Sequence, residues 1–226
     1  FVAPIAKRLG YSNRDMAIIL GDYANALAVP EKNAELLRRW DAELQAELAK
    51  PKEERNASLI GRLERQIEDL ETFIDEAEDL PEGLMSCGYT NGQASDLIRR
   101  ITDLGVTEAE GVQFSKLMTD WSYEILMERA RGGTLDPSVL QRFPLTFTNY
   151  VPFQNRFDNH TGAVNETRAY NPGSYHAMEG SRTAPDSSFL TLLAYSRRAA
   201  NEVGMQDFGI KLATKAILDA ANNVDN

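Results

Sequence analysis

Two histidines and two glutamates in the last third of the chain have side chains that bind metal ions in other proteins. They are His160, Glu166, His176 and Glu179. Imidazole and carboxylate groups are both zinc ligands. Metal motifs place such ligands at short fixed spacings, as in His-Glu-x-x-His or Cys-x-x-Cys, and neither spacing occurs here. We therefore interpret these four as ordinary loop residues and predict no metal site.

The single cysteine, Cys87, is a possible nucleophile by residue type. It has no histidine motif beside it, and we interpret it as a buried or incidental thiol. A phosphate-binding loop precedes a helix, whereas the GGTLD sequence (132–136) follows one. Acidic pairs such as Asp75 and Glu78 are explained by a solvated helix face. The sequence thus predicts no catalytic residue, no cofactor and no enzymatic activity within this chain.

Composition excludes further classes of function. The 226 residues carry a formal net charge of −10, which argues against a general nucleic-acid or membrane-surface binder because phosphate attracts clustered Lys and Arg. No run of about eighteen apolar residues predicts a membrane-spanning helix. One cysteine allows no disulfide within the chain and fits a reducing compartment. Because the chain starts with Phe1, we expect it to be a piece of a longer polypeptide.

Helical periodicity dominates the first third of the chain. Ser12, followed by Asp15, has the pattern of a helix N-terminus. Pro30 is predicted to end this helix and to stand at the start of the next. Two apolar stripes then flank the polar sequence KPKEER (50–55), and they predict an antiparallel helical hairpin over 31–80. The stripes consist of Leu37, Trp40, Leu44 and Leu48, and of Leu59, Leu63, Ile67, Leu70, Ile74 and Ala77.

Two aromatic residues of this hairpin are candidate anchors for further contacts. Trp40 and Phe73 are too large for two narrow helical stripes to cover completely. Burying an aromatic side chain contributes a few kcal/mol, so leaving both exposed is costly. We expect them to pack against neighbouring helices of the chain or against a partner protein.

Further helix boundaries follow the hairpin. The segment 79–93 reads as a loop, and Thr90 caps the helix behind it. Thr107 and Glu110 form a capping box for a longer helix. Gly132 and Gly133 are predicted to end that helix in a left-handed conformation.

The sequence FTNYVPFQNRF (147–157) differs from everything before it, because aromatic and polar residues alternate around a proline. Pro152 lacks an N–H donor and favours extended geometry at the preceding residue. We interpret Tyr150, Pro152, Phe153 and Phe157 as anchors on the helical bundle; local cover over a helix end accounts for the same residues. The forty residues of 146–185 are too many for a bare connection inside a compact domain.

These patterns together predict a mostly α fold. It comprises a helical domain over 1–145 that includes the hairpin arm 31–80, and an extended, irregular segment over 146–185. A C-terminal helix, or a pair of helices, over 186–226 is expected to pack back on the bundle.

The order of these pieces resembles a known family. The sequence GDYANALAVPEKNAELL (21–37) is similar to a segment of very large phage proteins with an Ala-x-x-Glu-(Arg/Lys)-Asn run, here Ala28, Glu31, Lys32 and Asn33. Those proteins continue with a long helix, a Tyr-Val-Pro stretch, an irregular loop and a Gly-Arg-x-x-x-Ala segment before a helix. This chain supplies ERARGGTLD (128–136), YVP (150–152), EGSRTAPDSSF (179–189) and RAAN (198–201) in that order. It departs from the pattern by Ser181, inserted before Arg182, and by the length of the hairpin.

On these motifs the chain resembles the large polyvalent-protein-associated region of giant phage virion proteins. That group includes internal ejection proteins and virion-carried RNA polymerases of short-tailed phages. The resemblance implies a non-catalytic structural or delivery segment, made in the host cytoplasm, packaged in the virion and delivered with the genome. Its implied partners are other virion proteins or the rest of a larger polypeptide, with viral DNA contacted at most indirectly and oligomers allowed. In this reading Arg182 marks the return of the chain to the bundle.

Two alternatives remain open at this point. One alternative is an accessory helical region of a virion RNA polymerase whose catalytic centre lies outside this chain. The other is a toxin-like effector or adaptor with the hairpin as its binding arm.

Overall fold

The computed structural model describes residues 1–137, 140, 148–149, 189–193, 196–197, 199–207 and 210. The described part of the chain is mostly helical and contains no β-strand element, so the predicted mostly α fold is confirmed. Residues 189–193, 196–197, 199–207 and 210 are also helical. The elements in chain order are α1 (Val2–Leu9), α2 (Asn13–Leu48), the short 3₁₀ helix η1 (Lys52–Glu54), α3 (Ala57–Phe73), α4 (Asn91–Asp103) and α5 (Glu108–Arg131).

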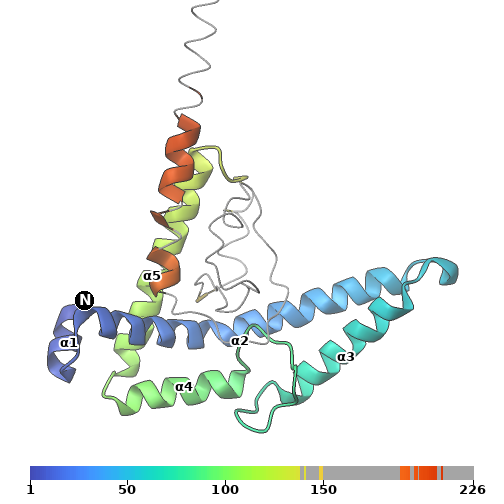
Figure 1. The fold of residues 1–226 in the computed structure, drawn as a ribbon, viewed down its shortest axis with the longest axis horizontal. Coiled ribbons are helices and arrows are strands. Elements are labelled where there is room, and N and C mark those ends of the chain that lie inside the picture. The colour runs from blue at the N-terminus through green and yellow to red at the C-terminus, as the bar shows by residue number, and fades with distance from the viewer. Residues whose placement is uncertain are drawn as a thin grey trace, which may run out of the picture.

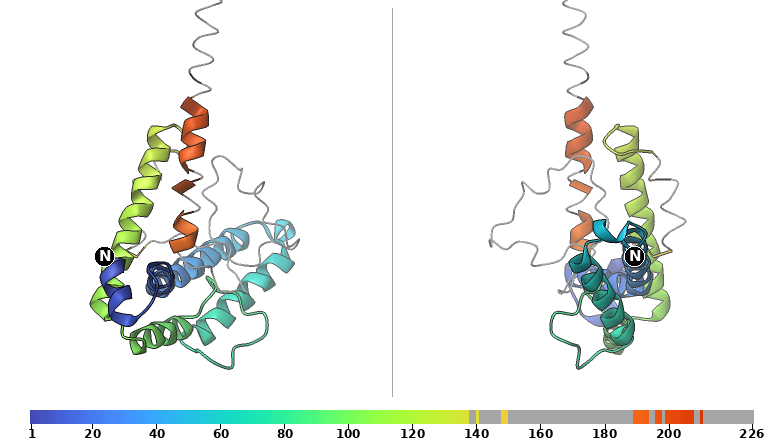
Figure 2. Two further views of the ribbon diagram at one scale, coloured as in Figure 1. Left: turned by 60° about the vertical axis from the view of Figure 1, so that its left-hand side comes forward. Right: turned by 90° about the vertical axis from the view of Figure 1, so that its right-hand side faces the viewer.

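Helix α2 is the central element, and α1, α3, α4 and α5 all contact it (Figure 1). Its 36 residues make it about 54 Å long at the usual rise per residue. Helix α3 runs back along the C-terminal half of α2, and α4 lies beside the N-terminal half (Figures 1 and 2). Helix α5 crosses α2 and rises away from it, with the described C-terminal helical residues alongside.

The prediction that Pro30 ends a helix is wrong, because α2 continues through it to Leu48. A proline inside a helix removes one hydrogen bond and costs about 3 kcal/mol. Pro30 itself faces solvent, while Val29 and Asn33 on either side are fully buried. Burial on both sides of the proline outweighs its local cost, so the first arm of the hairpin is the second half of one long helix.

The second arm is shorter than the apolar stripe predicted. Helix α3 ends at Phe73 rather than near Ala77. The carbonyl of Ile74 accepts hydrogen bonds from the backbone N–H of Asn91 (2.6 Å) and of Gly92 (3.3 Å), at the start of α4. The C-terminal end of α3 therefore meets the N-terminal end of α4, an arrangement that satisfies groups which both helix ends leave open.

The predicted caps are present. The Ser12 hydroxyl accepts from the Asp15 N–H at 3.1 Å, and Thr90 and Thr107 both form complete capping boxes. Gly133 follows α5 with φ +71°, the left-handed geometry expected there. Helix α1 was not predicted; Gly10 ends it with φ +75°. Arg8 on α1 binds both carboxylate oxygens of Glu110, which ties α1 to the start of α5.

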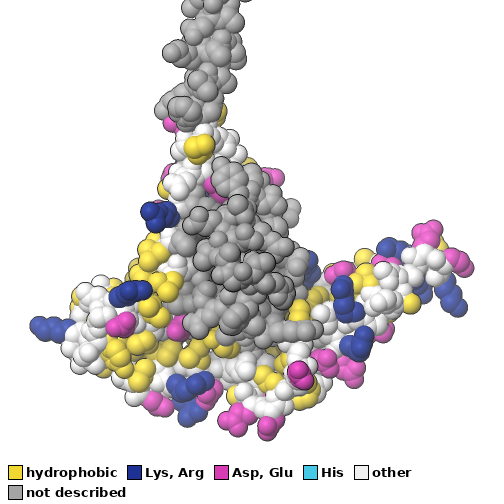
Figure 3. All heavy atoms as spheres, viewed as in Figure 1, with side chains coloured by type: hydrophobic (Ala, Val, Ile, Leu, Met, Phe, Trp, Pro, Cys, Tyr) yellow, Lys and Arg dark blue, Asp and Glu magenta, His cyan; other side chains and the backbone are white. Residues whose placement is uncertain are grey.

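The two largest apolar clusters among the described residues stabilise the bundle. The larger one joins α1, the first half of α2, α4, α5 and three residues of the C-terminal helical part, Phe189, Leu192 and Ala199. The second lies inside the hairpin, between the second half of α2 and α3, and Met85 from the following loop packs against it. In Figure 3 hydrophobic side chains gather where helices meet, and the projecting hairpin carries many charged ones.

Candidate functional site

The middle of α2 buries polar side chains that a soluble helix usually exposes. Lys32 is 4% exposed and Asn33 is fully buried, on the helix turn that follows Pro30. Charged and amide groups rarely enter a core unless they are hydrogen-bonded. This turn, with the loop residues it binds, is here named the α2 polar clamp: Glu31, Lys32, Asn33, Cys87, Tyr89, Asn91 and Asn149.

Asn33 holds the 87–91 loop against α2. Its amide Nδ2 donates to the Tyr89 carbonyl at 2.9 Å and to Asn91 Oδ1 at 3.1 Å. Its Oδ1 accepts from the buried Cys87 N–H at 2.9 Å. Both amide hydrogens and the carbonyl oxygen are therefore used. One side chain fixes the path of the loop between the hairpin and α4.

Lys32 and Cys87 influence each other across this interface. Burial lowers the pKa of the Lys32 amine to about 7, against the opposing effects of Cys87 and Glu31. Burial raises the pKa of the Cys87 thiol to about 11, although the charge of Lys32 acts in the other direction. The thiol lies 3.9 Å from the Val29 carbonyl and 3.7 Å from the Tyr89 carbonyl. A protonated, 2% exposed thiol is a poor nucleophile.

Glu31 binds the start of the segment predicted to be irregular. Its Oε2 accepts from the backbone N–H of Thr148 at 2.8 Å and of Asn149 at 3.2 Å. Its Oε1 accepts from Asn149 Nδ2 at 3.3 Å, and Asn149 Oδ1 accepts from the Ser115 hydroxyl at 3.3 Å. Asn149 thereby connects α2 to α5. A carboxylate that binds two successive backbone N–H groups makes charge-assisted bonds, which are stronger than neutral ones.

The clamp positions the surrounding helices and loops, because its hydrogen-bond donors and acceptors bind other parts of the same chain. Within the described residues, no group of three or more His, Cys, Asp or Glu could hold a metal ion. Both histidines lie outside the described residues. The arrangement is suited to holding α2, α4, α5 and the 148–149 segment together.

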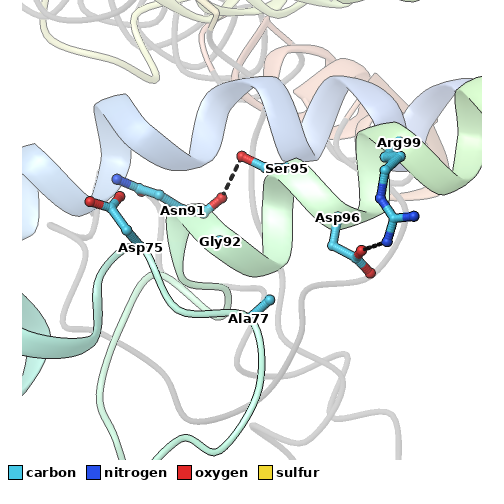
Figure 4. Close-up of a pocket in the computed structure, with 7 residues that line it drawn as sticks. All are labelled: Asp75, Ala77, Asn91, Gly92, Ser95, Asp96 and Arg99. Atoms are coloured by element: carbon cyan, nitrogen blue, oxygen red, sulfur yellow. Dashed lines mark hydrogen bonds and ion pairs between the residues drawn. The ribbon is translucent and has the colours of Figure 1, made fainter.

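An open pocket of about 420 Å³ lies beside the clamp, where the end of α3 meets α4. Asp75 and Asn91 lie at one end of it, and Asp96 and Arg99 at the other (Figure 4). A hydrogen bond from Arg99 holds the pKa of the Asp96 carboxyl below its usual value. The two ion-paired side chains satisfy each other, so this pocket offers little specific chemistry to a ligand.

Gly92 at the floor of this pocket is required by a close approach of two backbones. A Cβ atom on Gly92 would lie 2.2 Å from the Asp75 carbonyl oxygen. The contact sets how closely the end of α3 and the start of α4 approach, and with it the position of the clamp loop.

The anchor residues predicted from sequence have different positions. Trp40 is 4% exposed within the hairpin cluster, so its own chain covers it. Phe73, the last residue of α3, is half-buried. The remaining predicted anchors lie outside the described residues, as do both histidines: Tyr150, Pro152, Phe153, Phe157 and Arg182.

Sequence reasoning did not assign a structural role to the clamp. The feature of the sequence that could have revealed the clamp is Asn33. It is a polar residue on the apolar stripe that Val29, Leu36 and Trp40 form at helical spacing. Its partners are backbone groups more than fifty residues further along the chain, which no local pattern identifies.

Comparison of the chain with protein-family models, with curated proteins and with solved structures gives no match in any of the three. Among the residues that the structure describes, none of the helices combines the length and the apolar character needed to cross a bilayer.

Proposed function

We propose that this chain is a non-catalytic structural segment of a large phage virion protein that is packaged in the particle and delivered with the genome. The supporting observation is the position of the residues that resemble the family. Ala28, Lys32 and Asn33 are buried, and Glu31 and Asn33 hold two distant segments. In this role the motif serves the architecture of the segment.

The partners in this proposal are the rest of a larger polypeptide and other virion proteins. A segment that is packaged and delivered needs helices that keep fixed positions relative to one another. The long α2, contacted by four other helices, supplies such a frame. Contact with viral DNA, if the assembly makes one, is indirect in this proposal because the chain carries a net charge of −10.

An antibody raised against the recombinant chain tests the proposal. Purified particles of the phage that encodes the chain, and infected cells, are probed on a denaturing gel, and the reactive band is analysed by mass spectrometry. The expected result is a band from the particles that is much longer than 226 residues. A reactive protein found only in the cell extract and never in particles would overturn the proposal.

The non-catalytic part is tested separately. The purified chain is assayed for polymerase, nuclease and hydrolase turnover, and no activity above a buffer control is expected. Turnover that co-purifies with the chain and disappears on a single substitution contradicts this part, and would favour an enzyme.

An adaptor role for the hairpin is the second candidate. The observation that favours it is the projection of the paired α2 and α3 helices away from the main core (Figure 1). A variant in which residues 40–67 are replaced by a short Gly-containing turn tests it. Loss of a partner interaction with the main core intact favours the adaptor role.

A further inference from the structure

A groove of about 430 Å³ runs between the two helices of the hairpin. Its apolar floor comes from Leu44 on α2, which is 9% exposed, and from Ile67 on α3, which is partly buried. Carboxylates stand on both sides of this floor. The groove is lined by Asp41 and Leu44 of α2 and by Glu64, Ile67, Glu68, Glu71 and Thr72 of α3.

The three glutamates of α3 lie on one face of the helix. Glu64, Glu68 and Glu71 are spaced by four and by three residues, the spacing of neighbours on a helix surface. Like charges at these spacings destabilise a helix by a few tenths of a kcal/mol per pair. This spacing does not stabilise the isolated helix, and it leaves three negative charges on one face available to a partner.

Other carboxylates of the same hairpin form ion pairs with basic side chains. Glu35 pairs with Arg38, and Glu47 pairs with Lys50, each at 2.6 Å. None of the four groove carboxylates forms an ion pair with a residue that the structure describes. Asp41 accepts one hydrogen bond, from Gln45 Nε2 at 3.3 Å. The negative charge of the groove is therefore not neutralised by the hairpin itself.

We propose that this groove docks an amphipathic helix of another protein, one with Lys or Arg flanking an apolar stripe. The apolar stripe would cover Leu44 and Ile67, and the basic residues would pair with Asp41 on one side and the α3 glutamates on the other. A helix in a groove is a recurrent mode of recognition that combines these two contacts. The inference goes beyond the proposed function, because it follows from the hairpin alone and holds whatever larger protein contains this chain.

A synthetic peptide supplies the probe. It has about 18 residues, five helical turns, with Leu on one face and Lys on its flanks. The full chain is titrated with the labelled peptide, and fluorescence anisotropy is recorded at low and at physiological salt. Saturable binding of one peptide per chain is expected, weaker at higher salt because exposed ion pairs are screened.

Matched variants distinguish the groove from the general acidity of the chain. The groove variant is Glu64→Gln, Glu68→Gln and Glu71→Gln; the control variant is Glu43→Gln, Glu53→Gln and Glu54→Gln. Both remove three negative charges from exposed positions of the hairpin. We expect the groove variant to weaken binding about tenfold and the control variant to leave it nearly unchanged. Circular dichroism of both variants checks that the total helix content is unchanged.

Two further peptides test the apolar contact. One has the same composition in an order that does not separate Leu from Lys, and the other has Ser in place of Leu. Both are expected to bind more weakly than the amphipathic peptide. Equal weakening by the groove and control variants, or equal binding of the scrambled peptide, overturns the proposal and leaves non-specific charge attraction as the explanation.

Two other kinds of occupant, a second copy of the chain and a cation, would give different results in these measurements. Concentration-dependent self-association of the chain that the groove variant abolishes would assign the groove to a second copy and overturn the proposal. Displacement of the bound peptide by millimolar Ca²⁺, but not by the same ionic strength of NaCl, would likewise indicate a cation site instead of a helix-binding groove.

Discussion

Replacing Asn33 with alanine removes the acceptor of the buried Cys87 N–H and the donor to the Tyr89 carbonyl. A buried polar group that loses its partner costs about 1–3 kcal/mol. We expect Asn33→Ala to lower the free energy of unfolding by about 2–4 kcal/mol in urea denaturation. Asn91→Ala removes only the Asn33–Asn91 side-chain bond, so a loss of about 1 kcal/mol is expected. Equal losses in the two variants would show that Asn33 is not the centre of the clamp.

Lys32 makes stability depend on pH. Its pKa in the folded state is about 7, below the ordinary value of 10.5 that the unfolded chain has. Between these values the unfolded state binds more protons, so this group makes stability rise with pH. Cys87 has the opposite effect above about pH 9, because its folded pKa is raised from 9.0 to about 11. The expected window for a rise in stability is therefore pH 7 to 9.

The measurement for Lys32 compares urea midpoints from pH 6.5 to 9 for the natural chain and for Lys32→Met. Methionine keeps the volume of the side chain and carries no charge, and replacing a buried charge by a packed apolar group is often neutral or stabilising. The rise with pH is expected to be smaller in the variant. A slope that stays the same would mean that other groups produce it.

Helix α2 tests how far tertiary packing overrides a helix-breaking residue. Pro30 is exposed and inside the helix, so Pro30→Ala restores a backbone donor without disturbing the core. The helix gains up to about 3 kcal/mol, less about 0.4–1 kcal/mol from the greater freedom of the unfolded chain. We expect a net increase of about 1–2 kcal/mol in the free energy of unfolding. A decrease would indicate that a bend at Pro30 is needed for packing against the neighbouring helices.

The helix boundaries show which features of this fold are determined by the local sequence. Ser12, Thr90 and Thr107 were identified as caps because capping depends on residues within one turn. The length of α2 is not predicted by the local sequence, because whether the helix continues through Pro30 depends on burial against other helices. Helix α1 was missed because it has only eight residues, of which Ile5 and Ala6 are buried, too few for a clear period.

Two helical glycines should respond in opposite directions to the same substitution. A Cβ on Gly61 in α3 meets no atom within 4 Å, so Gly61→Ala is expected to stabilise by about 0.5–1 kcal/mol. A Cβ on Gly111 in α5 would lie 2.3 Å from the ring of Tyr23, which is 1% exposed. Gly111→Ala therefore forces α5 away from α2 and is expected to destabilise by about 1–3 kcal/mol. Thermal and urea unfolding of the pair measure both changes; a stabilising Gly111→Ala contradicts the described crossing of these helices.

At the scale of the whole molecule, the two largest apolar clusters imply two levels of local stability. The larger cluster draws residues from α1, α2, α4, α5 and the C-terminal helical part, whereas the hairpin cluster depends mainly on α2 and α3. Helix α3 has only two fully buried residues, Leu63 and Leu70. Regions with few buried apolar contacts open at lower free energy than the main core.

Hydrogen exchange measures these levels directly. We expect the amides of α3 to exchange faster than those of 16–29 in α2 and of 111–126 in α5, since opening the hairpin leaves the larger cluster in place. Leu63→Ala removes a fully buried side chain at a cost of about 2–4 kcal/mol. It should accelerate exchange throughout α3 and in 40–48 of α2, with little change in α5. If Leu63→Ala accelerates α5 and α3 equally, the hairpin and the main core unfold as one unit, and the hairpin is then no independent arm.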